Sequence, residues 1–325
     1  MVILKNSSNK CHTSINRNFS EQTRRNFLKT SIAALGGALT LTPSPLWAGL
    51  NQIIKTEKKI RVGGHPWVYA APLPGHDITP VLEQIFLDMR FAGLDGVELM
   101  HHPLRDKEAV ERIDELSEHY DMPVIGTSYE AKMWDKDQHN AILEDSELIL
   151  SNLKKVGGNT LGVSVGKANA QKTEKQLDDQ AELLVKISKV AEKNGIVLNL
   201  HNHTYEVENG MHDLKGTLKR IPDVKLGPDL NWLLRGGVDP VEFINTYGKQ
   251  IVFIHLRDQF KNGRWSEALG EGIMDFAAIG KALKKAGFTG DIIIELAHEN
   301  DFLMTRSIRS SLKKSREHIR RTMKV

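Results

Sequence analysis

Eight short apolar runs, separated by stretches with helical periodicity, constrain the fold of this 325-residue chain more than any other feature. Strands buried on both faces read as nearly continuous apolar runs, and helices between them imply that neighbouring strands are parallel. We therefore predict an α/β fold, a single (β/α)8 TIM barrel with a closed parallel sheet. The strands are expected at residues 60–63, 96–100, 123–128, 160–165, 197–201, 225–229, 251–255 and 291–295.

The stretches between these strands carry apolar residues at three- and four-residue spacing, as amphipathic helices do. Four of them are followed by Gly93, Gly157, Gly195 or Gly287, where a left-handed residue commonly closes a helix. The predicted helices span residues 78–92, 107–120, 142–156, 173–194, 211–221, 240–247, 276–286 and about 302–323.

A doubly wound open sheet is the structural alternative to the barrel. Such a sheet normally has a glycine-rich phosphate-binding turn after its first strand. The segment Gly63-Gly64-His-Pro-Trp does not fit that pattern and leads into a loop. No change of composition suggests a linker, so we expect residues 49–325 to form one domain.

The first 48 residues resemble a twin-arginine signal peptide. Arg24 and Arg25 precede Phe-Leu-Lys and a weakly apolar run at 32–41, and Ala48 is a small residue suited to cleavage. The alternative is an ordinary apolar anchor, but the run is too short to cross about 30 Å of hydrocarbon. We expect export to the periplasm, with no stable membrane insertion after cleavage.

Composition narrows the possible partners and ligands. The signal segment holds six Lys and Arg against one Glu, so its removal lowers the net charge from +3 to about −2. A slightly acidic body has no general attraction to phosphate backbones, so nucleic acid is not an expected partner. Because Cys11 is the single cysteine, any metal ligands must be histidines and carboxylates.

Side chains able to bind a metal stand at the C-terminal ends of four predicted strands. They are His201 or His203, Asp229, His255 and Glu295. In a barrel these ends converge on one face, where active sites lie. Two carboxylates with one or two imidazoles suit a divalent cation such as Mn²⁺, Mg²⁺ or Zn²⁺.

Each of these residues also has a purely structural interpretation. A single histidine is usually a hydrogen-bonded structural residue, and alternation along a strand allows only one of His201 and His203 to face the axis. We favour His201 as the ligand and His203 as a substrate-contacting or supporting residue. Asp229 could instead cap a helix or turn, although its burial is costly unless it meets a cation. Glu295 could form a structural salt bridge rather than act as ligand or base.

Several motifs resemble one known family. They are Gly96-Val-Glu-Leu, His201-Asn-His203, Asp229-Leu-Asn-Trp232, His255-Leu-Arg-Asp258 and Gly270-Glu-Gly272, followed by Glu295. Together these motifs resemble the xylose-isomerase-like barrels known as sugar phosphate isomerases/epimerases. The resemblance covers nearly all of residues 59–300 and implies one metal held by Asp229, His255 and Glu295.

The resemblance breaks at the fifth strand, where the family carries a glutamate and this chain has His201. The epimerases of that family resemble two-glutamate enzymes. One glutamate removes a proton from the substrate and the other returns it on the opposite face. With one glutamate missing, elimination or hydration of a keto-sugar becomes an alternative. Glu206 could replace the missing carboxylate or be a solvated loop residue.

From this resemblance we expect a divalent-metal-dependent isomerase or epimerase that acts on a sugar or keto-sugar through an enediolate. Glu295, His201 and His203 are the catalytic candidates. A metal-dependent lyase or hydratase on 3-keto-glycosides and a non-catalytic periplasmic sugar-binding protein are the alternatives. The expected partner is a small carbohydrate, and the chain could form a homo-oligomer. Candidate substrate contacts are Glu98, His101, Trp232, Asp258 and Glu206, although Trp232 could equally be packing and Asp258 could cap a loop.

Overall fold

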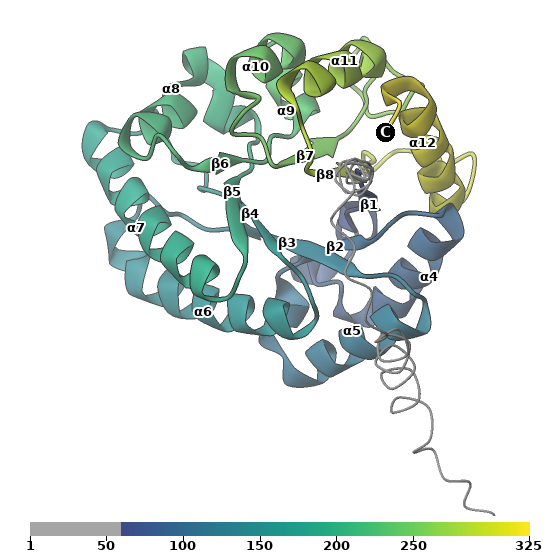
Figure 1. The fold of residues 1–325 in the computed structure, drawn as a ribbon, viewed down its shortest axis with the longest axis horizontal. Coiled ribbons are helices and arrows are strands. Elements are labelled where there is room, and N and C mark those ends of the chain that lie inside the picture. The colour runs from purple at the N-terminus through teal and green to yellow at the C-terminus, as the bar shows by residue number, and fades with distance from the viewer. Residues whose placement is uncertain (1–59) are drawn as a thin grey trace, which may run out of the picture. The chain divides into compact units, whose positions relative to one another are not determined.

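The computed structural model describes residues 60–325, so the predicted signal peptide and the start of the domain at residue 49 lie outside the described residues. Eight parallel strands lie inside a ring of helices (Figure 1). This arrangement confirms the predicted (β/α)8 barrel. The strands are β1 (Val62–Gly64), β2 (Val97–Met100), β3 (Val124–Glu130), β4 (Thr160–Ser164), β5 (Val197–Leu200), β6 (Lys225–Leu226), β7 (Phe253–Leu256) and β8 (Asp291–Ile294).

Neighbouring strands pair in the order β6-β5-β4-β3-β2-β1-β8-β7. Parallel bridges from Leu226 to Ile251 and from Asp229 to His255 connect β6 to β7 and close the barrel. The strand β6 is short because Gly227 and Pro228 follow it, and proline has no N–H for the ladder. A Cβ at position 227 would lie only 1.8 Å from Asn199 Oδ1, so the close approach of β5 requires glycine there.

The helices agree with the predicted ranges at most positions. Gly93, Gly157, Gly195 and Gly287 all have positive φ, as expected of residues that close helices. The helices are α3 (Trp67–Ala70), α4 (Leu82–Ala92), α5 (Lys107–His119), α6 (His139–Lys155), α7 (Glu174–Lys193), α8 (Thr204–Arg220), α9 (Leu230–Arg235), α10 (Pro240–Tyr247), α11 (Phe276–Ala286) and α12 (Ile308–Met323).

Three helices depart from the prediction. Helix α8 begins at Thr204 rather than 211, and it is interrupted by left-handed residues at Asn209, Gly210 and Met211. The four-residue α3, which begins at Trp67 where a loop was expected, and the six-residue α9 were not predicted, because so few residues do not display helical periodicity. Within the described residues, none of the helices combines the length and apolarity needed to span a bilayer.

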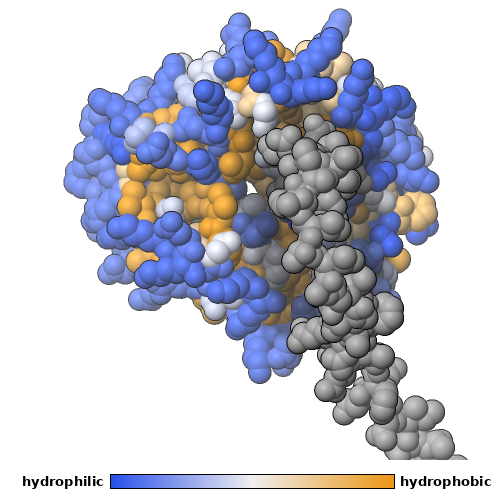
Figure 2. Space-filling model, viewed as in Figure 1, coloured by the Kyte–Doolittle hydropathy of each residue, from blue (hydrophilic) through white to orange (hydrophobic). Residues whose placement is uncertain are grey.

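Apolar side chains fill the interior of the barrel below the carboxyl ends of the strands, and also the layer between strands and helices. Ile125, Phe253 and Ile293 form a small fully buried cluster, and the larger cluster packs the sheet against the outer helices. In Figure 2, hydrophilic residues cover the outer helices and hydrophobic ones gather around the strands. Because side chains alternate along a strand, His255 and Glu295 lie on the same side as Phe253 and Ile293 and project above this cluster.

Candidate active site

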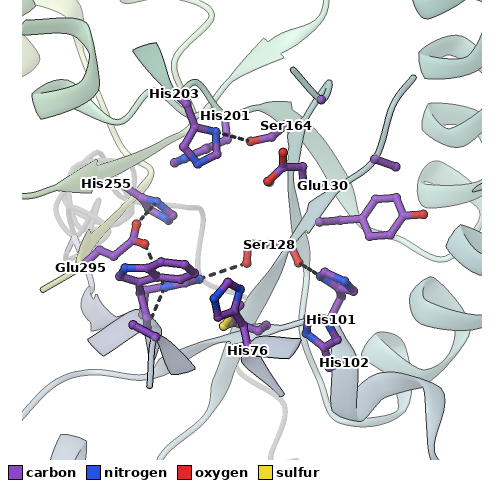
Figure 3. Close-up of a pocket in the computed structure, with 18 of the residues that line it drawn as sticks. His76, His101, His102, Ser128, Glu130, Ser164, His201, His203, His255 and Glu295 are labelled. Carbon is purple, nitrogen blue, oxygen red and sulfur yellow. Dashed lines mark hydrogen bonds and ion pairs between the residues drawn. The ribbon is translucent and has the colours of Figure 1, made fainter. Parts of the chain in front are cut away.

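A cavity of about 1120 Å³ opens where the strands end at their carboxyl side (Figure 3). This is the face on which barrel enzymes carry their active sites. Its walls include residues at the ends of β1, β3, β4, β5, β7 and β8, namely His65, Ser128, Ser164, His201, His203, His255, Arg257 and Glu295.

Three predicted metal ligands meet beside this cavity. Ligand atoms of His201, Asp229 and His255 all lie within 4.8 Å of one another, and the three residues are buried. Glu295 joins them, since its Oε2 lies 2.9 Å from His255 Nδ1. Within the described residues these two buried atoms face each other and have no other hydrogen-bond partner. Two imidazoles and two carboxylates are ligands that suit a divalent cation, so the chemistry of this donor set fits a metal.

Charges around His255 are unusually concentrated. Its Nε2 lies 2.5 Å from Glu98 Oε2, so the ring stands between the carboxylates of Glu98 and Glu295. Burial opposes the charge, but the two carboxylates raise the pKa of His255 to about 10. A cation at this site would therefore have to displace a proton from His255. By contrast, burial and the neighbouring His255 hold the pKa of His201 well below its usual range, so His201 is neutral.

Glu98 was predicted to contact the substrate, but the structure places it away from the cavity. Glu98 is fully buried on β2 and does not line the cavity. Its partner is the Nε2 side of His255, which leaves Nδ1 facing Glu295. Carboxylates that accept the second N–H of a metal-binding histidine fix the ring orientation. Glu98 is thus placed to orient His255 rather than to meet a sugar.

Replacement of Glu98 tests this role. We expect Glu98→Leu to weaken divalent-metal binding by about 10- to 100-fold, the usual effect of losing such a partner. Glu98→Gln keeps an oxygen acceptor beside the ring and should weaken binding less. Calorimetric titration of the metal-free proteins with Zn²⁺ or Mn²⁺ measures both. Equal affinities in both variants and the parent protein would contradict the role.

Arg257 is the main residue that the sequence prediction missed. Its Nε donates to Asp229 Oδ2 at 2.8 Å, and its Nη2 donates to Glu295 Oε1. The guanidinium is buried and links the two carboxylates of the predicted metal site. The signal was present in the sequence, because Arg257 stands two residues after His255 and therefore faces the same side.

Asp229 fills its structural and its proposed role at once. Its Oδ1 accepts the backbone N–H groups of Asn231 and Trp232, both at 2.9 Å, and thereby caps α9. Its Oδ2 faces Arg257. The helix-cap alternative is therefore real, and one oxygen still points toward the ligand cluster.

His65, at the end of β1, also belongs to this site and was not predicted. Its Nδ1 lies 3.3 Å from Glu295 Oε1, and its Nε2 is hydrogen-bonded to Ser128 Oγ at 3.0 Å. Burial lowers the pKa of His65, and the carboxylates of Glu295 and Glu98 oppose that shift. The strand-end rule applied to β1 would have identified it. For Glu295, burial opposes ionisation, but Arg257, His65 and His255 outweigh it and hold the pKa of Glu295 well below its usual range.

His203 lines the cavity, whereas Glu206 does not. His203 Nδ1 lies 3.3 Å from Ser164 Oγ, and burial lowers the pKa of His203 to about 4. Glu206 accepts the backbone N–H of His203 at 2.7 Å and that of Val165 at 3.3 Å. Its carboxylate is committed to the start of α8, so the structure does not bring it to the place of the missing glutamate.

Of the other predicted substrate contacts, Trp232 and His101 line the cavity and Asp258 does not. Trp232 lines the cavity together with Trp265, and their rings lie 5.2 Å apart in edge-to-face contact. His101 also lines the cavity, on its far side. Asp258 does not, because it accepts the backbone N–H groups of Gly270, Gly272 and Met274 and so organises that loop. The loop-cap alternative therefore describes its observed contacts.

Comparison with known proteins supports the same fold. A family model described as "Xylose isomerase-like TIM barrel" matches residues 87–322. A search among curated proteins finds no significant match.

Solved structures share the fold at low sequence identity. D-allulose 3-epimerase from Methylomonas sp. is 17% identical with a TM-score of 0.66, and the match covers 82% of this chain and 98% of that one. 3-Keto-D-glucoside 4-epimerase from E. coli is 17% identical with a TM-score of 0.65, and the match covers 81% of this chain and 100% of that one. A sugar phosphate isomerase/epimerase from Parabacteroides distasonis ATCC 8503 is 16% identical with a TM-score of 0.62, and the match covers 82% of this chain and 95% of that one.

Proposed function

This chain belongs to the xylose isomerase-like TIM barrel family, and from that premise we propose that it is a divalent-metal-dependent isomerase or epimerase of a sugar or keto-sugar. One observation carries the proposal: ligand atoms of His201, Asp229 and His255 lie within 4.8 Å of one another beside a large cavity, and Glu295 contacts His255 there. Structures with the same fold include epimerases of D-allulose and of a 3-keto-D-glucoside, which favours this class of reaction.

The roles of the residues follow from their charge and position. A bound divalent cation would supply Lewis-acid chemistry toward the substrate carbonyl. Glu295 is ionised, so it can take the proton from the carbon beside that carbonyl and lead to an enediolate. His201 and His203 are neutral imidazoles, able to hold or return a proton. Trp232 lines the cavity, where its ring could stack on the sugar.

A lyase or hydratase acting on 3-keto-glycosides is the second candidate. It is favoured by one specific observation, the histidine at position 201 where the resembling enzymes carry their second glutamate. A single carboxylate base is enough for elimination, whereas symmetric epimerisation uses two. We further propose that residues 1–48 direct export by the twin-arginine route, which would place the reaction in the periplasm.

Removal of the acidic proton from the substrate is common to all these reactions, so its exchange is the test. Chelator-treated protein would be reloaded with Mn²⁺, Mg²⁺ or Zn²⁺ and incubated in D₂O with D-allulose, L-ribulose and a 3-keto-glucoside. Metal-dependent deuterium uptake beside the carbonyl supports the proposal, and the product then distinguishes epimer from elimination product. Absence of exchange with every metal contradicts an enzyme of this class and favours the sugar-binding protein.

Metal binding should also stabilise the fold. A ligand that binds only the folded state at 100 times its dissociation constant stabilises it by about 2.7 kcal/mol. We therefore expect a higher melting temperature on adding Zn²⁺ or Mn²⁺ to chelator-treated protein, reversed by excess chelator. Scanning calorimetry measures the shift, and an unchanged melting temperature with every metal would argue against the site.

A further inference from the structure

The cavity extends well beyond the proposed metal site. Figure 3 shows His201, His255 and Glu295 on one side, with His101 and His102 on the other. At about 1120 Å³ the cavity exceeds the roughly 300–1,000 Å³ typical of ligand pockets, whereas a hexose has only about a dozen heavy atoms. The far side, which we call the distal subsite, is lined by His76, His101, His102, Arg105, Tyr129 and Asp145.

A fixed polar network forms one wall of the distal subsite. Arg105 Nε and Nη2 donate to the two oxygens of Asp145 at 2.6 and 2.7 Å. Tyr129 OH donates to Asp145 Oδ2 at 3.0 Å. These residues come from η3 (His102–Arg105), α6 and β3, so segments far apart in sequence hold the network rigid. The pair occupies two of the five N–H donors that a guanidinium carries, which leaves others to meet a ligand.

Two uncharged imidazoles form the neighbouring wall. His101 and His102 stack with ring centroids 4.2 Å apart. His101 Nδ1 donates to the Ser128 carbonyl at 3.1 Å, so its Nε2 is an acceptor. Nδ1 of His102 is buried and has no hydrogen-bond partner among residues 60–325. Burial and the adjoining His102 and Arg105 lower the pKa of His101 to about 3.

The charge of this wall favours a neutral, hydroxyl-bearing ligand. Arg105 is neutralised by Asp145, and both imidazoles offer hydrogen bonds without charge. Neutral acceptors and a paired guanidinium match the hydroxyls of a sugar ring better than an anion. The exposed rim residues Lys132 and Lys167 make a sugar phosphate the competing ligand.

We propose that the distal subsite binds the second ring of a glycoside whose keto ring lies at the proposed metal site. The substrate class is therefore a two-ring keto-glycoside rather than a free keto-sugar. This assignment rests on the proposed function in one respect, the placing of the reacting keto ring at the proposed metal site.

The test compares one keto ring with and without its neighbour. With metal-loaded protein, kcat/KM would be measured for 3-keto-glucose, its 6-phosphate and a 3-keto-disaccharide. We expect the disaccharide to be preferred, and Arg105→Met to lower the ratio of disaccharide to monosaccharide kcat/KM by about tenfold or more, as expected on losing a charged hydrogen-bond donor. His102→Ala, which keeps the Arg105–Asp145 pair, should lower the same ratio. Arg112→Met is the control, because Arg112 pairs with Glu83 on exposed surface.

The possible outcomes separate this inference from the proposed function. Equal kcat/KM for both sugars, or an equal loss for both in Arg105→Met, overturns the distal subsite and leaves the proposed function standing. Preference for the 6-phosphate, lost in Lys132→Met, overturns it in favour of an anion. If none of the sugars reacts, the proposed function fails. The subsite is then judged by calorimetry, where equal disaccharide affinity of the parent protein and Arg105→Met would overturn it.

Discussion

Glu295→Gln is expected to lower metal-dependent proton exchange by about 10²- to 10⁴-fold, the contribution of a well-placed proton-transfer group. The amide keeps the size of the side chain but cannot take a proton. In the parent protein the Glu295 carboxylate lies between Arg257, His65 and His255. These neighbours lower its pKa and keep it ionised, as a base must be at neutral pH. Deuterium uptake at saturating substrate measures the loss.

Because Glu295 is also a proposed ligand, metal occupancy must be checked in the same variant. The exchange rate is therefore measured at several metal concentrations until it no longer rises. Glu115→Gln serves as the control, since Glu115 is an exposed helix residue that pairs with Arg112. A variant with full metal occupancy and an undiminished exchange rate would rule out Glu295 as the base.

The second large effect is expected on stability rather than on rate. Arg257→Met should destabilise the metal-free protein by about 3 to 5 kcal/mol, the usual cost of removing one partner from a buried ion pair. Both Asp229 and Glu295 would lose a buried cationic partner. A metal ion bound to the same two carboxylates would replace that charge, so most of the loss should disappear in the metal-loaded protein. Urea unfolding with chelator and with saturating Zn²⁺ measures the difference.

Arg220→Met is the matched control for this experiment. Arg220 also joins two carboxylates, those of Glu174 and Asp178, but both are exposed. Its loss should cost less than about 1 kcal/mol, with or without metal. If Arg257→Met is destabilised equally in both conditions, the guanidinium and the metal do not share the two carboxylates.

Much of the fold could be predicted because its signals are local. Apolar runs, helical spacing and the four closing glycines each depend on a few adjacent residues, and all eight strands lie within a few residues of their predicted positions. The short helix α3, the start of α8 and the whole of α9 were missed. The positions of α8 and α9 depend on caps made by His203 with Glu206 and by Asp229, and these caps are visible only when the loops are placed.

The candidate site was predicted in part, for the same reason. Placing ligands at strand ends was enough to bring His201, Asp229, His255 and Glu295 together. His65 obeys the same rule and was overlooked. The actual partners of Glu98 and Asp258 could not be inferred, since Glu98 reaches a strand 157 residues away and Asp258 binds backbone of a loop without regular structure.

The sequence by itself determined the alternation of strands and helices, the parallel sheet and the edge at which the ligands gather, because these follow from which side each residue faces. Tertiary structure alone decided that Arg257 joins Asp229 to Glu295 and that Glu98 supports His255. Periodicity gives the direction of a side chain but not its distance from others. That distance is set only when the barrel closes and brings remote strands to opposite sides of one narrow interior.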